Sequence, residues 1–126
     1  MSIPYKLVKI TSPLSKKNTQ KYYAKVKTRG EMDLRNLAEK IASTSTLSTV
    51  DVVAVLESLL QVIPDELLSG YIVNLGDFGS FAPSVKSNGS NTEKEFTNRM
   101  IKKTTILFKP GKYIKNKLKH AKYEKI

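Results

Sequence analysis

The sequence predicts an α+β fold in which two helices precede a three-stranded antiparallel sheet and a short C-terminal helix. Three observations lead to this prediction. Apolar residues recur with a helical period over residues 34–42 and dominate residues 50–60. A turn bracketed by glycines at residues 76–79 is flanked by alternating apolar and polar residues. A proline–glycine pair at residues 110–111 then separates a β-rich run from a basic segment.

Two helices are expected in the first part of this fold. The apolar positions of the first helix, spaced at i, i+3, i+4, i+7 and i+8, are Leu34, Leu37, Ala38, Ile41 and Ala42. Asp33 is its expected N-cap, because its carboxylate can accept hydrogen bonds from the first free amides. Ser48 and Asp51 have the spacing of a capping box and predict the start of the second helix. Pro64 is expected to kink or end that helix, and Gly70 to close the turn that follows.

The second helix is apolar on most of its faces, so it needs cover on more than one side. We therefore predict a homodimer built on this helix. The alternative is a monomer in which strands from the N-terminal residues supply the cover. The residues expected to form the core or the dimer interface are Val52, Val53, Leu56, Leu59, Leu60, Phe78, Phe81 and Phe108.

The sheet is expected around the turn within residues 71–81. Val73 and Leu75 alternate with a polar residue, and Gly76 and Gly79 allow a tight turn between two antiparallel strands. The second strand is then expected over residues 78–86, with Pro83 indicating an edge or a bulge. Its continuation is predicted as a loop at 87–91, a short capped helical turn at 92–96 and a third strand at 102–108.

Residues 1–30 form a basic extension with one or two expected strands. Residues 2–9 alternate loosely and residues 21–28 alternate better, while residues 11–20 are predicted as a polar loop. Tyr22 and Tyr23 could stack on bases, although burial in the strand is the competing interpretation. At the other end of the chain, residues 121–126 are expected to fray.

Composition limits the possible functions. The 126 residues are the length of one small domain, and they contain no cysteine that could form a disulfide or act as a nucleophile. No stretch has the roughly 20 apolar residues of a membrane helix, and the N-terminus lacks the apolar run of a signal peptide. The expected location is therefore the cytoplasm of a prokaryote.

The net charge of +11 is segregated along the chain. Residues 1–30 carry eight Lys and Arg residues and no acidic residue, residues 31–85 carry two basic and eight acidic residues, and residues 86–126 carry twelve basic and three acidic residues. Two basic ends around an acidic body favour a polyanionic partner, most often a nucleic acid. The alternative is that the lysine-rich ends only increase solubility.

Two motifs resemble those of the bacterial histone-like HU/IHF DNA-binding proteins. They are Val-x-Leu-Gly-x-Phe-Gly-x-Phe at residues 73–81 and Phe-Lys-Pro-Gly-Lys at residues 108–112, and the resemblance covers residues 34–118. It implies an HU-like domain over residues 31–120, preceded by the extension. It also implies a homodimer that binds duplex or distorted DNA at the nucleoid, without a cofactor, a membrane or a small-molecule substrate.

In HU-like proteins the segment between the second and third strands is an arm that reaches around DNA, with a proline wedged between base pairs. The matching residues 86–103 contain no proline, and they include Glu93 and Glu95, which repel phosphate. Proline intercalation is therefore not expected, and a shortened hairpin with an inserted helical turn is preferred. The candidate DNA-binding residues are Lys86, Asn88, Arg99, Lys102, Lys103, Lys109, Lys112 and Lys115.

Weaker candidates for phosphate contact lie in the N-terminal extension: Lys16, Lys17, Lys21, Lys25 and Lys27. No catalytic constellation is present, and the single histidine, His120, cannot build a histidine-based metal site. We therefore expect neither an enzyme nor a metalloprotein. Two hypotheses remain: a largely non-specific DNA-binding protein, or a dimeric scaffold of HU-like fold with weak or lost DNA binding. An RNA-binding role is a third option.

Overall fold

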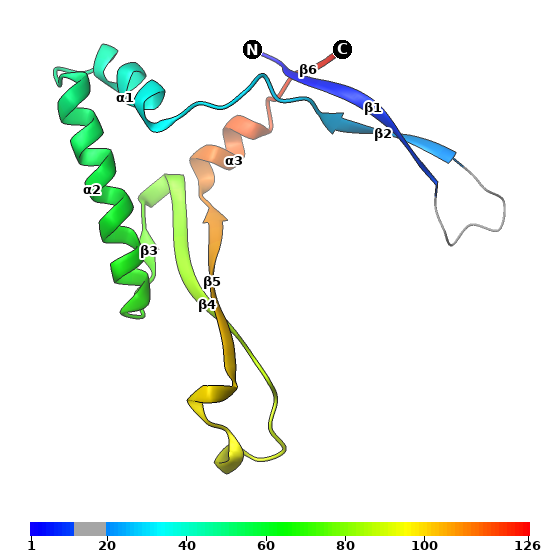
Figure 1. Cartoon of the computed structure of the whole chain (residues 1–126). Coiled ribbons are helices and arrows are strands. Elements are labelled where there is room, and N and C mark those ends of the chain that lie inside the picture. The colour runs from blue at the N-terminus through cyan, green and yellow to red at the C-terminus, as the bar shows by residue number, and fades with distance from the viewer. Residues whose placement is uncertain (12–19) are drawn as a thin grey trace. The chain divides into compact units, whose positions relative to one another are not determined.

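The computed structural model describes residues 1–11 and 20–126. The predicted polar loop at residues 11–20 therefore lies almost entirely outside the described residues. The chain divides into two compact units: a terminal unit of residues 1–33 and 117–126, and a central unit of residues 34–116. The described residues form three α-helices and two three-stranded sheets, so the α+β prediction is confirmed (Figure 1).

The central unit begins with the two predicted helices, α1 (Leu34–Ser43) and α2 (Thr49–Leu68). The predicted cap of α2 is confirmed, because the Ser48 hydroxyl accepts a hydrogen bond from the Asp51 amide at 3.2 Å. The two helices pack against each other (Figure 1). Ala38 of α1 is fully buried, so this position of the unit favours a small side chain.

Pro64 does not end α2, which continues to Leu68. The proline removes one backbone hydrogen bond, but the turn beyond it places Leu67 in the core, with an exposed fraction of 5%. The helix ends in a Schellman motif. The Gly70 amide donates to the Leu67 carbonyl at 3.0 Å, and the Tyr71 amide donates to the Glu66 carbonyl at 3.1 Å. Gly70 has φ 93°, which confirms its predicted role.

The sheet of the central unit has the order β3-β4-β5 and is antiparallel throughout. Its strands are β3 (Val73–Asn74), β4 (Gly79–Ser87) and β5 (Ile101–Pro110). The turn between β3 and β4 is a single 3₁₀ turn, Gly76–Phe78, rather than a simple β-turn. β3 is only two residues long and begins at Val73, which pairs with Phe81, so residues 82–87 of β4 have only β5 as their registered neighbour. Pro83 therefore lies in a part of β4 that is at the edge of the sheet. This agrees with the prediction from its missing N–H.

Aromatic rings pack at the start of this sheet. Phe108 lies between Phe78 and Phe81, with ring centroids 5.8 Å and 4.9 Å apart respectively. The end of α2 lies over the same face of the sheet, because Pro64 and Leu67 line a hollow together with Pro83 of β4.

Most of the residues predicted for the core or dimer interface are not buried within one chain. Val52 is 3% exposed and is buried as predicted, and Val53, Leu56 and Phe81 are partly buried. The remaining four are 40–57% exposed in the single chain: Leu59, Leu60, Phe78 and Phe108. Their burial would require a second molecule and stays a prediction.

The terminal unit is a sheet of order β2-β1-β6. β1 (Ile3–Thr11) and β2 (Gln20–Val26) are the two strands expected in the extension, and they pair antiparallel. The prediction that residues 121–126 fray is wrong, because β6 (Tyr123–Lys125) pairs parallel with β1. Backbone hydrogen bonds hold these C-terminal residues in place. The Ile3 amide donates to the Lys122 carbonyl at 2.8 Å, and the Ile126 amide donates to the Tyr5 carbonyl at 3.0 Å.

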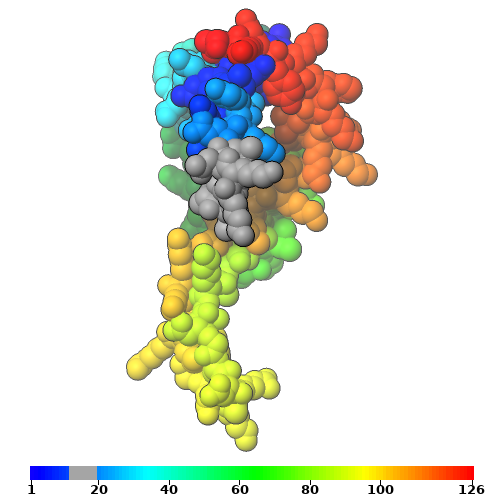
Figure 2. Space-filling view, turned by 90° about the vertical axis from the view of Figure 1, so that its right-hand side faces the viewer, coloured from blue at the N-terminus to red at the C-terminus, as the bar shows by residue number. Residues whose placement is uncertain are grey.

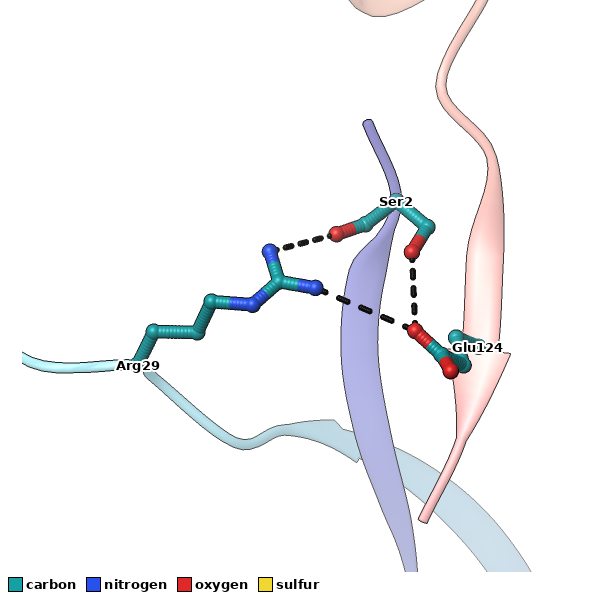
Figure 3. A network of polar contacts seen from close by, with 3 residues as sticks. All are labelled: Ser2, Arg29 and Glu124. Carbon is teal, nitrogen blue, oxygen red and sulfur yellow. Dashed lines mark hydrogen bonds and ion pairs between the residues drawn. The ribbon is translucent and has the colours of Figure 1, made fainter.

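A polar network joins the two ends of the chain within the terminal unit (Figure 3). An Arg29 guanidinium nitrogen donates to the Ser2 carbonyl at 2.8 Å, and the Ser2 hydroxyl donates to Glu124 Oε2 at 3.0 Å. A second guanidinium nitrogen lies 3.8 Å from the same carboxylate oxygen. Both charged side chains are about two-thirds exposed, so the ion pair adds little stability and mainly fixes the position of β6.

The turn before β4 generates a first prediction. Gly79 has φ 144°, and a Cβ there would lie 2.5 Å from the Lys109 carbonyl oxygen. We expect Gly79→Ala to lower the free energy of unfolding by at least about 2 kcal/mol, measured by urea denaturation. Gly89→Ala is the matched control, because open space surrounds Gly89, and it should change stability by less than about 0.5 kcal/mol. Equal effects of the two substitutions would contradict this account of the turn.

Candidate nucleic-acid interface

The pairing register of β4 and β5 separates polar and apolar side chains onto opposite faces of the hairpin. Residues paired in register share a face, and alternate residues along a strand share it too. One face carries Phe81, Pro83 and Val85 of β4 opposite Phe108, Ile106 and Thr104 of β5. The other face, here called the lysine face, carries Asn74, Ser80, Ala82, Ser84, Lys86, Lys103, Thr105, Leu107 and Lys109.

Lysines stand at both ends of the lysine face. Lys86 and Lys103 lie directly opposite each other at the end near the loop. Lys109 lies at the other end, opposite Ser80, which is itself opposite Asn74 of β3. Lys103 and Lys109 of β5 are six positions apart, which corresponds to roughly 20 Å at about 3.3 Å per residue. The face therefore presents cationic groups at two separated places, with the pairs Ser84–Thr105 and Ala82–Leu107 between them.

A β-bulge lies beside the paired lysines. The register shifts between Lys86 and Ser87, since Ser87 pairs with Ile101 while Lys86 pairs with Lys103. Lys102 is the extra residue on β5 and has no registered partner on β4. A bulge bends the strand and changes the direction of a side chain. It therefore places a further lysine next to the cross-strand pair.

The loop beyond the bulge contains the predicted helical turn. The Thr92 hydroxyl accepts from the Glu95 amide at 3.3 Å and caps the 3₁₀ turn Glu93–Glu95, so this prediction is confirmed. A second 3₁₀ turn, Asn98–Met100, contains Arg99. The Asn88 amide donates to the Met100 carbonyl at 2.8 Å and closes the loop at its base. In Figure 2 this loop, coloured yellow, extends away from the rest of the central unit.

The other end of the lysine face leads into α3 (Lys112–Leu118). The Gly111 amide donates to the Phe78 carbonyl at 3.0 Å, which holds the start of this helix against the 3₁₀ turn before β4. Lys112 and Lys115 follow on the helix at a spacing of three residues, which places them on neighbouring positions of its surface. A shallow hollow beside Lys109 is lined by Asn74, Gly76, Gly79, Ser80, Lys109, Pro110 and Gly111.

The basic side chains of this site are not paired with acidic groups of the described residues. In residues 1–11 and 20–126, no acidic group forms an ion pair with any of the seven basic candidates. The ion pairs there include Arg29–Glu124 and Arg35–Glu39, neither of which uses a candidate residue. The candidates therefore remain available to an anionic partner, except that Glu93 and Glu95 add negative charge to the loop.

The structure brings the eight predicted residues into two groups. Lys86, Asn88, Arg99, Lys102 and Lys103 belong to the bulge and loop, and Lys109, Lys112 and Lys115 belong to the junction of β5 with α3. The sequence analysis missed the neutral members of the lysine face: Asn74, Ser80, Ser84 and Thr105. Their period of two along the strands was visible in the sequence and could have identified them.

The weaker candidates lie in or beside the terminal unit. Lys16 and Lys17 lie outside the described residues. Lys21 and Lys25 are on β2, opposite Ile10 and Lys6 of β1. The expectation that Tyr22 and Tyr23 are buried is wrong, because they are 64% and 49% exposed. The reason is that β2 is an edge strand of a three-stranded sheet, and none of the described elements of its unit packs over these rings.

Two further observations limit the chemistry of the described residues. No group of three or more His, Cys, Asp or Glu side chains among them could hold a metal ion. Within the same part of the chain, every helix is too short or too polar to cross a membrane.

Comparisons with known proteins agree with the fold and with the two sequence motifs. The family described as "HU domain fused to wHTH, Ig, or Glycine-rich motif" matches residues 1–125. The DNA-binding protein HU of Thermotoga maritima is 32% identical over 94 residues, which cover 70% of this chain and 100% of that protein.

A solved structure is also similar. It is the crystal structure of a protein from Bacteroides vulgatus ATCC 8482 proposed to be a bacterial DNA-binding protein. The TM-score is 0.68 at 11% identity, over 99% of this chain, and the chain spans 48% of that protein's structure. At this identity the similarity concerns the fold. The family match over residues 1–125 and the Thermotoga maritima relative show that the chain belongs to the HU-like family. Within it, the matching group is the one whose HU domain is fused to a further motif.

Proposed function

We propose that this protein is a histone-like, largely sequence-non-specific DNA-binding protein that acts as a homodimer at the nucleoid in the cytoplasm. The observation that supports this most strongly is the lysine face, where Lys86, Lys103 and Lys109 share one side of the β4–β5 hairpin without an acidic neighbour on that face. The Thermotoga maritima relative is itself named as a DNA-binding protein. Lysines in this arrangement neutralise phosphates and release counterions from duplex DNA.

The chemistry of the lysine face favours binding without base specificity. Lysine and serine contacts to phosphate fix position but carry no sequence information. Arginine is a common base-reading side chain in the major groove, and Arg99 is the one arginine between residues 86 and 103. The same segment contains no proline to wedge between base pairs. The protein would therefore bend DNA less strongly than relatives with such a proline.

A homodimer would cover the apolar surface that one chain leaves exposed. Six large apolar residues of α2 are 40–78% exposed: Val50, Val55, Leu59, Leu60, Val62 and Leu68. Soluble monomers rarely leave this much apolar surface of one helix exposed, because its contact with water is unfavourable. Pairing through α2 would bury these side chains and bring two lysine faces into one molecule.

The first test is a salt series with a fluorescent duplex, measured by anisotropy. Each neutralised phosphate contributes about −0.9 to the slope of log K against log salt. We expect Lys103→Ala combined with Lys109→Ala to weaken binding and to reduce the slope by roughly 1.8 for each chain that contacts the duplex, or roughly 3.6 when both lysine faces of the dimer are bound. Lys40→Ala combined with Lys119→Ala removes equal charge away from the lysine face and should leave the slope nearly unchanged. Equal losses in both double variants, or no binding at low salt, would contradict the proposal.

A second candidate function is a dimeric scaffold with weak or lost DNA binding, which the two glutamates of the loop favour. If the loop approaches phosphate, Glu93→Gln with Glu95→Gln should tighten duplex binding roughly two- to fivefold, because two repulsive charges are removed. Anisotropy at low salt measures the change. Unchanged affinity in this variant, together with weak binding by the parent chain, would favour the scaffold.

The dimer has its own test. We expect Leu60→Asp to shift the protein from dimer to monomer at micromolar concentration, because an unpaired carboxylate would be buried in the interface. Sedimentation equilibrium measures the mass. Ile10→Asp is the control, since Ile10 is similarly exposed at 51% but lies on β1. A parent chain that sediments as a monomer would contradict the proposed assembly.

A further inference from the structure

The sheet of the terminal unit has an aromatic and basic face that the proposed function does not use. The register of β1 with β2 and β6 places alternate residues of the three strands on this face. Its members, here called the tyrosine face, are Ile3, Tyr5, Leu7, Lys9, Tyr22, Ala24, Val26, Tyr123 and Lys125. Six of them line a shallow apolar hollow of about 450 Å³: Ile3, Tyr5, Leu7, Ala24, Val26 and Tyr123.

The aromatic rings of this face are available to a ligand. Tyr22 is 64% exposed and Tyr123 is 69% exposed, although tyrosine on a sheet usually packs against a neighbouring layer. The Lys9 ammonium lies 5.9 Å from the centre of the Tyr22 ring, within the range of a cation–π contact. A cation is therefore already held beside an exposed ring.

The charge of the tyrosine face is entirely positive. Lys9 and Lys125 lie on it, and Glu124 is the one acidic residue in the described strands β1, β2 and β6. Glu124 alternates to the opposite face, where it accepts from the Ser2 hydroxyl and pairs with Arg29 (Figure 3). A ligand that fits this face must offer flat apolar rings together with negative charge.

We propose that the tyrosine face binds unpaired nucleic acid by stacking bases on Tyr22 and Tyr123, with phosphates near Lys9 and Lys125. Only unpaired bases can leave the helical stack and offer their faces to tyrosine, so a duplex does not satisfy this site. Tyr123 pairs with Ile3 and Tyr22 pairs with Lys9, so the two rings are six residues apart along β1, or roughly 20 Å. A short single strand can run along β1 between them, over the apolar floor formed by Leu7 and Ala24.

The tyrosine face and the lysine face belong to different units and to different sheets. Positive charge alone would bind any polyanion, but the exposed tyrosine rings favour a polyanion that carries bases, which is a nucleic acid. DNA and RNA single strands share this chemistry, and the experiment distinguishes them.

The test uses the full chain and three fluorescent probes of equal length, a thymidine 12-mer, a uridine 12-mer and a 12-base-pair duplex, followed by anisotropy. We expect Tyr22→Ala and Tyr123→Ala each to weaken binding of at least one single strand about fivefold or more. A loss of about fivefold is the low end of the contribution that one stacked base makes to binding. Tyr22→Phe keeps a stacking ring and should bind as the parent does. Duplex affinity should remain unchanged in all of these variants.

Tyr23→Ala is the matched control, because Tyr23 is the next residue on β2 and faces the opposite side of the sheet. An abasic 12-mer of equal charge provides a second control and should bind at least about fivefold more weakly than the thymidine strand. Circular dichroism melts establish that each variant is folded.

Three results would overturn the proposal. One is equal affinity for the abasic and thymidine strands, and another is an equal loss in Tyr22→Ala and Tyr23→Ala. The third is a change of oligomeric mass in Tyr22→Ala with single-strand binding intact, which would identify the tyrosine face as a contact between copies of the chain. Because duplex binding is measured in parallel, a failure here is distinct from a failure of the proposed function.

Discussion

The pairing of β4 with β5 is the constraint on which the central unit depends. Side chains alternate along each strand, so a slip of one residue would move Phe81 and Phe108 to the solvent side and the lysines toward α2. The aromatic contact at 4.9 Å holds the register at one end of the hairpin. The same pairing therefore produces both the apolar face that packs on the helix and the cationic face that would contact phosphate.

The terminal unit depends on a different constraint, since its sheet is assembled from both ends of the sequence. β1 would be an edge strand without β6, and the bonds from Ile3 to Lys122 and from Ile126 to Tyr5 pair its free backbone groups. This closure also aligns Tyr123 with the tyrosines of β1 and β2. The C-terminal residues thus contribute to a surface that the N-terminal extension alone could not form.

Local signals in the sequence predicted most of the elements. Ser48 with Asp51 and the glycine at position 70 predicted the two ends of α2, because caps use groups a few residues apart. Thr92 likewise indicated the turn in the loop. The motifs at residues 73–81 and 108–112 indicated the family, since their glycines and aromatic residues meet at the start of the sheet.

Long-range features could not be predicted in this way. The parallel pairing of β6 joins residues more than 110 positions apart, and a strand of three residues leaves no periodic signal. Continuation of α2 through Pro64 depends on the burial of Leu67 in the tertiary structure. The exposure of Tyr22 depends on how many layers cover the sheet, which the alternation of a strand does not indicate. The neutral members of the lysine face were detectable in principle, because their period of two is local.

The central claim is that DNA contacts one face of the β4–β5 hairpin. Titration of the isotopically labelled protein with a short duplex, followed by backbone and lysine side-chain NMR shifts, tests it most directly. The account predicts the largest shifts at Ser80, Ser84, Lys86, Lys103 and Lys109, with small shifts at Val85 and Ile106 on the opposite face. Shifts concentrated on α1, or spread equally over both faces of the hairpin, would contradict it.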